Sequence, residues 1–274
     1  MRSLASTRDD KSAMDFFQAF ILGIIEGVTE FLPISSTGHL ILASKLLGIK
    51  GEFAKTFEIA IQLGAIFSVA VLYAKLLLNS FETWKRIIVA FIPTGIIGLA
   101  FYKIVKKYLL GNEMVVVWTL FIGGILIILF ELWEKKKDRR IEEVKDNEDI
   151  TAISLKQSFL IGIFQSLAII PGLSRSAATI IGGLLLGIDR KTIVKFSFLL
   201  AFPTMLAATG LDLLKSAGEF SSNDWGALAV GLITSFIVAI FSIKFLLRFI
   251  EKHTFISFGI YRIIVAILFF IFVL

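Results

Sequence analysis

The chain alternates between long apolar stretches and short polar interruptions, a pattern that predicts a bundle of membrane helices. A helix needs roughly 20 apolar residues to cross a hydrocarbon core of about 30 Å. Segments of this length occur three times in each half of the chain, at residues 56–78, 84–104, 115–133, 191–214, 225–247 and 255–274. We therefore expect an all-α, polytopic integral membrane protein.

Two further apolar stretches are each interrupted by a polar turn, and they predict re-entrant hairpins. The arms are residues 15–32 and 39–47 in the first hairpin, and 154–170 and 177–186 in the second. The second arm of each pair is too short to cross a membrane. Each hairpin is therefore expected to enter and leave the membrane on the same side.

The two halves share landmarks at a nearly constant offset of about 139 residues, which indicates an internal duplication. The matches are Gly23 with Gly162, residues 46–49 with 185–188, Phe57 with Phe196, and Glu26 with Gln165. Pro33 and Ser36 match Pro171 and Ser174 after a slip of one residue. We divide the membrane domain, residues 14–274, into repeat 1 (14–133), a linker (134–152) and repeat 2 (153–274), with a polar N-terminal extension at 1–13.

Counting crossings predicts that the repeats are inverted. Each half crosses three times, an odd number, so the second half must begin on the opposite side of the membrane. In such architectures the broken helices of the two halves meet near the midplane around a shared site. The side that holds the charged linker carries about 16 Lys and Arg against about 10 opposite, which predicts a cytoplasmic linker and external termini.

Composition supports the membrane class. The chain is 57% hydrophobic, with 27 phenylalanines and a mean hydropathy of +0.86. Its formal charge of +6 suits basic loops better than a nucleic-acid partner. The absence of cysteine excludes disulfides and cysteine-ligated metals.

Candidate chemistry lies in the two hairpins, where ionisable residues are costly and usually functional. Glu26 and Glu30 are four residues apart, so one helical face presents both carboxylates. The pair is suited to share a divalent cation, Mg²⁺ or Ca²⁺, or to divide proton affinity between the two groups. The alternative is a structural glutamate that caps the helix.

The first polar turn, Pro33 to His39, opens a short helix with hydroxyl side chains. Ser35, Ser36 and Thr37 are candidate donors to a phosphate, because helix N-termini attract anions. Simple helix capping by these residues is the alternative. His39 adds a group that serves as base, acid or nucleophile near neutral pH.

The second turn, which begins at Pro171, supplies Arg175. Its planar guanidinium matches phosphate oxygens, and further donors follow from Ser174, Ser176 and Thr179. Arg175 also has a structural interpretation, as the partner of a glutamate across the repeat interface. Weaker candidates are a second layer or structural hydrogen bond at Glu58 and Gln62, and snorkelling or pairing at Asp212, Arg262, Glu131 and Lys244.

These groups together predict a phosphate-handling site that a lipid reaches from the membrane. Phosphoryl transfer needs charge neutralisation, positioning and a nucleophile, and all three kinds of group are present. The sequence holds no Gly-rich Walker loop, so neither ATP-driven chemistry nor an organic cofactor is expected.

The stretches EGVTEFLPISSTGHL and PGLSRSAATI, with FEIAIQLG between them, resemble the undecaprenyl-diphosphatase (bacitracin-resistance protein) family, and the resemblance covers residues 14–274. It implies hydrolysis of undecaprenyl diphosphate to undecaprenyl phosphate and inorganic phosphate for cell-wall synthesis. It also implies a bacterial plasma-membrane location, bacitracin resistance and dependence on a divalent cation. The implied catalytic residues are Glu26, Glu30, Ser36, His39 and Arg175.

Several alternatives stay open at this point. Ser36 or His39 attacks the terminal phosphorus, or His39 activates water for the attack. The lipid diphosphate is expected to enter from the external leaflet. A transporter that flips undecaprenyl phosphate is the rival function, since inverted repeats also describe transporters. The expected partners are the polyprenyl diphosphate and membrane lipids, no nucleic acid is expected, and a homodimer remains open.

Overall fold

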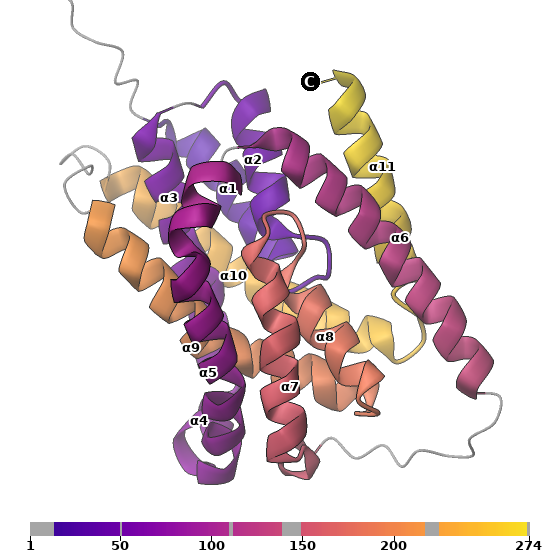
Figure 1. The fold of residues 1–274 in the computed structure, drawn as a ribbon. Coiled ribbons are helices and arrows are strands. Elements are labelled where there is room, and N and C mark those ends of the chain that lie inside the picture. The colour runs from indigo at the N-terminus through magenta and orange to yellow at the C-terminus, as the bar shows by residue number, and fades with distance from the viewer. Residues whose placement is uncertain (1–13, 50, 110–111, 139–148, 217–224, 273–274) are drawn as a thin grey trace, which may run out of the picture.

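The computed structural model describes residues 14–49, 51–109, 112–138, 149–216 and 225–272, and helices account for most of them (Figure 1). No strand occurs among these residues. The first half contains α1 (Phe16–Thr29), α2 (Ser36–Leu46), α3 (Glu52–Leu72), α4 (Ala74–Asn79), α5 (Phe81–Ile104), the π-helical turn η1 (Val105–Leu109) and α6 (Glu113–Asp138). The second half contains η2 (Ile150–Ala152), α7 (Leu155–Ser166), η3 (Leu167–Ile169), α8 (Arg175–Leu185), α9 (Arg190–Ser216), α10 (Trp225–Ile250) and α11 (Ile256–Phe272).

Five helices in the described part are long and apolar enough to cross a membrane: α3, α5, α6, α9 and α10. The sixth predicted crossing corresponds to α11, an apolar helix of 17 residues. The short helices α1, α2, α7 and α8 lie where the two hairpins are predicted. The protein is therefore a multi-pass membrane protein, as the sequence pattern predicts.

Two element boundaries differ from the prediction. The segment predicted at 56–78 breaks at Tyr73, after α3 has already run for 21 residues, or about 31 Å, which is enough to cross the membrane. At the other end, α6 continues through the charged residues 134–138, which include helix-favouring Glu and Lys. The rest of the linker, up to residue 148, and the N-terminal extension at 1–13 lie outside the described residues.

The local geometry of the two hairpins repeats at the offset found in the sequence. Asp15 and Ser154 cap α1 and α7 with the same reciprocal capping box. Ser35 and Ser174 cap α2 and α8 with positive φ angles of 73° and 80°. Ser174 therefore corresponds in structure to Ser35, 139 residues earlier, and not to Ser36. The offset shortens by one residue only at Pro33 and Pro171, before the second arms begin.

Each hairpin packs against a helix of the other half. The first arm α1 lies along α10, where a Cβ on Gly23 would come within 2.8 Å of the Gly231 carbonyl oxygen. The first arm α7 lies along α5, where a Cβ on Gly162 would overlap the Ala90 carbonyl. Figure 1 shows that α1 begins at the end of the bundle where the C-terminus lies, whereas α7 begins at the opposite end.

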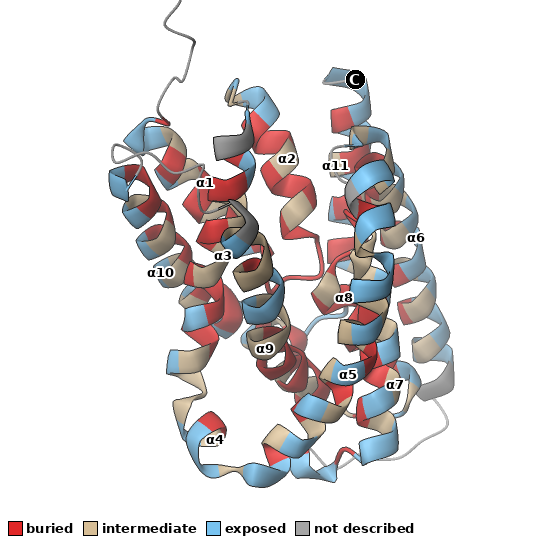
Figure 2. Ribbon diagram, turned by 60° about the vertical axis from the view of Figure 1, so that its left-hand side comes forward, coloured by how far each residue is buried: buried red, intermediate tan, exposed pale blue. Residues whose placement is uncertain are grey.

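Burial separates a lipid-facing surface from the interior (Figure 2). Large apolar side chains such as Leu78, Leu99 and Phe241 are exposed on the outer faces of the helices, as expected for contact with lipid. The turn between α1 and α2 is buried although it is polar, and it appears red in Figure 2. The backbone N–H and C=O groups of this buried turn require hydrogen-bond partners within the protein.

Candidate functional site

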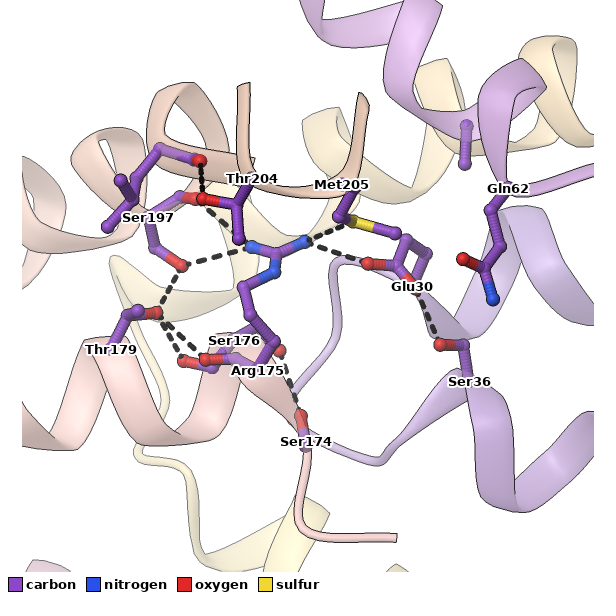
Figure 3. A network of polar contacts seen from close by, with 12 residues as sticks. Glu30, Ser36, Gln62, Ser174, Arg175, Ser176, Thr179, Ser197, Thr204 and Met205 are labelled. Carbon is purple, nitrogen blue, oxygen red and sulfur yellow. Dashed lines mark hydrogen bonds and ion pairs between the residues drawn. The ribbon is translucent and has the colours of Figure 1, made fainter. Parts of the chain in front are cut away.

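The two polar turns meet inside the bundle through an ion pair. Arg175, the first residue of α8, places Nη2 2.8 Å from Oε1 of Glu30, which caps the C-terminal end of α1 (Figure 3). The Glu30 side chain is buried and that of Arg175 is partly buried. The structure therefore contains the structural alternative for Arg175, an ion pair with a glutamate of the other repeat. Both residues of this ion pair also line a cavity.

Ser36 lies on the other side of the same carboxylate. Its Oγ donates to Oε2 of Glu30 at 2.5 Å, and this contact is buried. The Glu30 carboxylate is thus held between a hydroxyl and a guanidinium. A hydroxyl bonded to a carboxylate in this way is the arrangement of a nucleophile and its base.

The guanidinium of Arg175 is oriented by its other contacts. Nη1 donates to the backbone oxygen of Ser197 at 3.0 Å, and Nη2 lies 3.5 Å from Sδ of Met205. The ring of Phe31 lies 5.7 Å from the guanidinium carbon. The remaining donor, Nε, is buried and has no hydrogen-bond partner in the described part of the chain.

The polar groups line a small cavity of about 110 Å³. The predicted site residues on its wall are Glu30, Ser35, Ser36, Thr37, Ser174 and Arg175. The hydroxyls and the guanidinium that line this cavity beside a carboxylate are suited to bind a phosphate group.

Ser176 and Thr179 do not line this cavity but lie behind Arg175 (Figure 3). Ser176 Oγ donates to the backbone oxygen of Leu32 at 2.9 Å, which ties α8 to the first turn. Thr179 Oγ1 lies 2.6 Å from Oγ of Ser197, the residue that holds Arg175. In this structure both hydroxyls support the site residues, and their direct binding of phosphate stays a prediction.

Gln62 and Met205 also line the cavity, and little in the sequence points to either role. The four-residue spacing of Glu58 and Gln62 predicts either a second layer around the site or a structural hydrogen bond. The Glu58 carboxylate accepts a hydrogen bond from Ser44 Oγ, which agrees with the structural alternative. Met205 looks like any apolar residue of a membrane helix, so no sequence signal could have identified it.

Glu26 lies one helical turn before Glu30 and is fully buried. Both of its carboxylate oxygens lack a hydrogen-bond partner among the described residues, whereas both oxygens of Glu30 are occupied. No group of three or more His, Cys, Asp or Glu side chains that could hold a metal ion occurs among the described residues. Glu26 does not itself line the cavity, but its carboxylate, which has no described partner, lies one helical turn from Glu30, which does. The pair fits a cation that takes most of its ligands from a phosphate substrate and water, as Mg²⁺ usually does.

His39 lies beside the cavity and does not line it. Its Nδ1 lies 2.7 Å from the backbone oxygen of Ser35, which can only accept, so Nδ1 carries the proton. Its Nε2 lies 2.9 Å from the hydroxyl oxygen of Tyr261, and the imidazole stacks on the Tyr261 ring. Both ring nitrogens are therefore engaged in holding the first turn of α2.

Comparison with known proteins identifies the family. The family described as "Bacitracin resistance protein BacA" matches residues 19–268. The chain belongs to this family. Undecaprenyl-diphosphatases are similar over nearly the whole chain: that of Aquifex aeolicus is 51% identical over 93% of this chain and 98% of its own length. That of Sulfurihydrogenibium sp. is 53% identical over 94% and 99%.

The region that matches the BacA family contains the second hairpin, the first hairpin from residue 19 onward and every residue that lines the cavity. It also includes two residues of α11, which lies outside the hairpins. Tyr261 contacts His39 at the end of the first turn, and Arg262 contacts both turns. The family assignment thus covers the candidate site together with the helices that support it.

Proposed function

We infer that this protein hydrolyses undecaprenyl diphosphate to undecaprenyl phosphate and inorganic phosphate. The observation that carries the inference is the cavity in which Arg175 and Ser36 both contact the carboxylate of Glu30. Membership of the BacA family and the names of the similar proteins support the same reaction. They do not favour the rival function, transport of undecaprenyl phosphate.

We propose that the diphosphate is bound by Arg175 and by the N-terminal ends of α2 and α8. The caps of these helices, Ser35 and Ser174, both line the cavity. Free N–H groups and the helix dipole favour an anion at such positions. Substrate oxygens would compete with Glu30 for Arg175, which would free the Glu30 carboxylate for proton transfer.

In the proposed chemical step, Ser36 Oγ attacks the terminal phosphorus while Glu30 takes the hydroxyl proton. The new Oγ–P bond replaces the anhydride P–O bond, and undecaprenyl phosphate leaves with the electrons of that bond. Water then hydrolyses the phosphoserine and releases inorganic phosphate. Ser36 is favoured over His39 because Ser36 lines the cavity and His39 does not.

A divalent cation, Mg²⁺ or Ca²⁺, belongs to this proposal, with Glu26 as its first candidate ligand and Glu30 as the second. When bound, it would neutralise charge on the diphosphate oxygens. Glu26 is suited to the role because its buried carboxylate has no other described partner.

We further propose that the halves are inverted repeats in a bacterial plasma membrane, with a cytoplasmic linker and a cavity that opens externally. The opposite starting ends of α1 and α7 support the inversion (Figure 1). The bias of Lys and Arg toward the linker side supports the orientation. A homodimer stays a prediction that rests on no contact in this structure.

The test is phosphate release from undecaprenyl diphosphate by purified protein in detergent, where no compartments exist for transport. Wild type is expected to release phosphate, and Arg175→Ala is expected to lose that activity. Trapping a phosphoenzyme and locating its label at Ser36 would support the nucleophile, and a label on His39 would contradict it. Wild-type protein that releases no phosphate would contradict the function itself.

A further inference from the structure

Arg262 of α11 is a fully buried arginine that binds backbone carbonyls. The sequence led us to expect that a basic residue in the last helix would snorkel to the surface or pair with an acid. That expectation is wrong for Arg262, because its side chain points into the bundle and no carboxylate of the described residues lies within ion-pair distance. Its donors go instead to the backbone oxygens of Pro33, Leu173, Gly172, Thr119 and Leu120.

The carbonyls that Arg262 binds belong to both polar turns. Nη1 lies 3.3 Å from the oxygen of Pro33 in the first turn and 2.9 Å from that of Leu173 in the second. Nη2 lies 2.9 Å from the oxygen of Gly172, also in the second turn. Irregular backbone at membrane depth has no water to satisfy its carbonyls, so these turns depend on a donor from within the protein.

The two turns lead directly into the site. Pro33 comes shortly before Ser35 and Ser36, and Leu173 comes directly before Ser174 and Arg175. One guanidinium nitrogen thus joins the segments that carry the serine hydroxyl and the arginine of the cavity. A change in the position of Arg262 would change the separation of these groups.

Helix α6 provides a pocket shaped for the guanidinium. A Cβ on Gly123 would overlap Nη2 of Arg262 and lie 2.9 Å from its Cζ. The remaining contacts on this side are the backbone oxygens of Thr119 and Leu120. A lysine could not replace these contacts, because an ammonium offers three donors from one point whereas a guanidinium offers five in a plane.

We propose that Arg262 is a positioning residue that fixes the spacing of Ser36 and Arg175 by binding both turns at once. The proposal rests on the proposed hydrolysis of a lipid diphosphate. Arg262 does not line the cavity, so it acts through the turns and does not contact the substrate.

The experiment measures kcat and KM for phosphate release with Arg262→Lys. Displacement of catalytic groups by about 1 Å can cost about 100-fold in rate, so we expect kcat to fall by about that factor while KM changes little. Gly123→Ala is the second variant, since it keeps the arginine but displaces its guanidinium. We expect the same kcat loss from it, and it keeps the test decisive if Arg262→Lys does not fold.

Arg86→Lys is the matched control. Arg86 also donates to backbone oxygens, among them those of Ile153 at 2.6 Å and Thr151 at 2.7 Å, and it pairs with Glu82; all of these lie outside both turns. We expect it to lower thermal stability while kcat stays near the wild-type value. Unchanged kcat in folded Arg262→Lys and Gly123→Ala, an equal kcat loss in Arg86→Lys, or a change confined to KM would each overturn the proposal. Wild-type protein without activity would instead contradict the proposed function.

Discussion

At the scale of single residues, Ser35 and Ser174 show how strain is placed at the site. They are the two non-glycine residues with positive φ in the described part of the chain. Such conformations cost about 1–3 kcal/mol and persist where surrounding structure enforces them, often at functional sites. Here the unusual backbone turns each hydroxyl toward the first turn of its own helix, where Oγ accepts from Gly38 N at 3.3 Å or from Ala177 N at 3.2 Å.

This strain predicts different losses of stability for two replacements of Ser174. Glycine adopts positive φ freely and is an acceptable N-cap, whereas alanine keeps the strain and removes the cap. We expect Ser174→Ala to lose about 1 kcal/mol of stability and Ser174→Gly only a few tenths. Thermal unfolding in detergent measures both, and equal stability of the two variants would contradict the account.

Arg175 is expected to need its planar fork as well as its charge. Lysine cannot contact Glu30, the Ser197 backbone and a phosphate oxygen at once. We expect Arg175→Lys to lower kcat by about 10²–10³-fold, the usual cost of removing a preorganised donor to the transition state. Arg248→Lys, at an exposed position near the end of α10, is the control and should keep full activity in the phosphate-release assay. Near-normal kcat in Arg175→Lys would refute the assignment.

The two glutamates should respond differently to metal. We expect chelation to stop phosphate release and Mg²⁺ or Ca²⁺ to restore it. Glu26→Gln should raise the cation concentration needed for half-maximal activity by at least about tenfold, because it removes a charged ligand without breaking a described hydrogen bond. Glu30→Gln should reduce activity at every cation concentration, since it breaks the contacts with Arg175 and Ser36. A cation titration of both variants distinguishes these outcomes, and an unaltered titration of Glu26→Gln would exclude Glu26 as a ligand.

At the scale of elements, close helix contacts hold each hairpin against the other half. Gly162 on α7 lies so near α5 that a side chain would overlap the Ala90 backbone, whereas nothing lies within 4 Å of a Cβ on Gly98 of α5. We expect Gly162→Val to lower the melting temperature and the activity, because α7 would be pushed away and α8 with it. Gly98→Val is the matched control and should melt like wild type. If both variants melt alike, packing at Gly162 is not what holds the hairpin.

Lengths and polarity were enough to predict the elements, but not their contacts. The short second arms and the polar turns predicted two pairs of short helices, which the structure contains as α1–α2 and α7–α8; their re-entrant course stays a prediction. The break at Tyr73 carried no Gly or Pro signal. The roles of Arg262 and Gln62 depend on contacts between segments far apart in the chain, which no local pattern encodes.

The candidate site could be predicted only in part, because residue types are visible in the sequence and contacts between distant segments are not. Glu30, Ser36 and Arg175 stand out because charged and hydroxyl groups are rare in apolar segments, and they do converge. The direction of a side chain on a short helix depends on its neighbours, so the sequence could not predict that His39 turns to Tyr261. Nor could it predict that Thr179 lies behind Arg175.

At the scale of the whole molecule, inversion of the repeats makes a prediction about corresponding loops. The loop before α6, at Asn112, and the loop before α11, at Lys252, occupy equivalent positions in the two halves. In parallel repeats such positions would lie on one side of the membrane, and in inverted repeats they lie on opposite sides. Both side chains are exposed, so each can carry a label.

The chain contains no cysteine, so a single introduced cysteine gives an unambiguous signal. We expect Asn112→Cys to react with a membrane-impermeant thiol reagent in intact cells, because the loop before α6 is predicted to be external. Lys252→Cys should react only after the membrane is permeabilised. Phosphate release by each variant checks that the fold is retained. Labelling of both cysteines from the same side would contradict the inversion, and labelling with the sides exchanged would keep the inversion but reverse the predicted orientation of the linker.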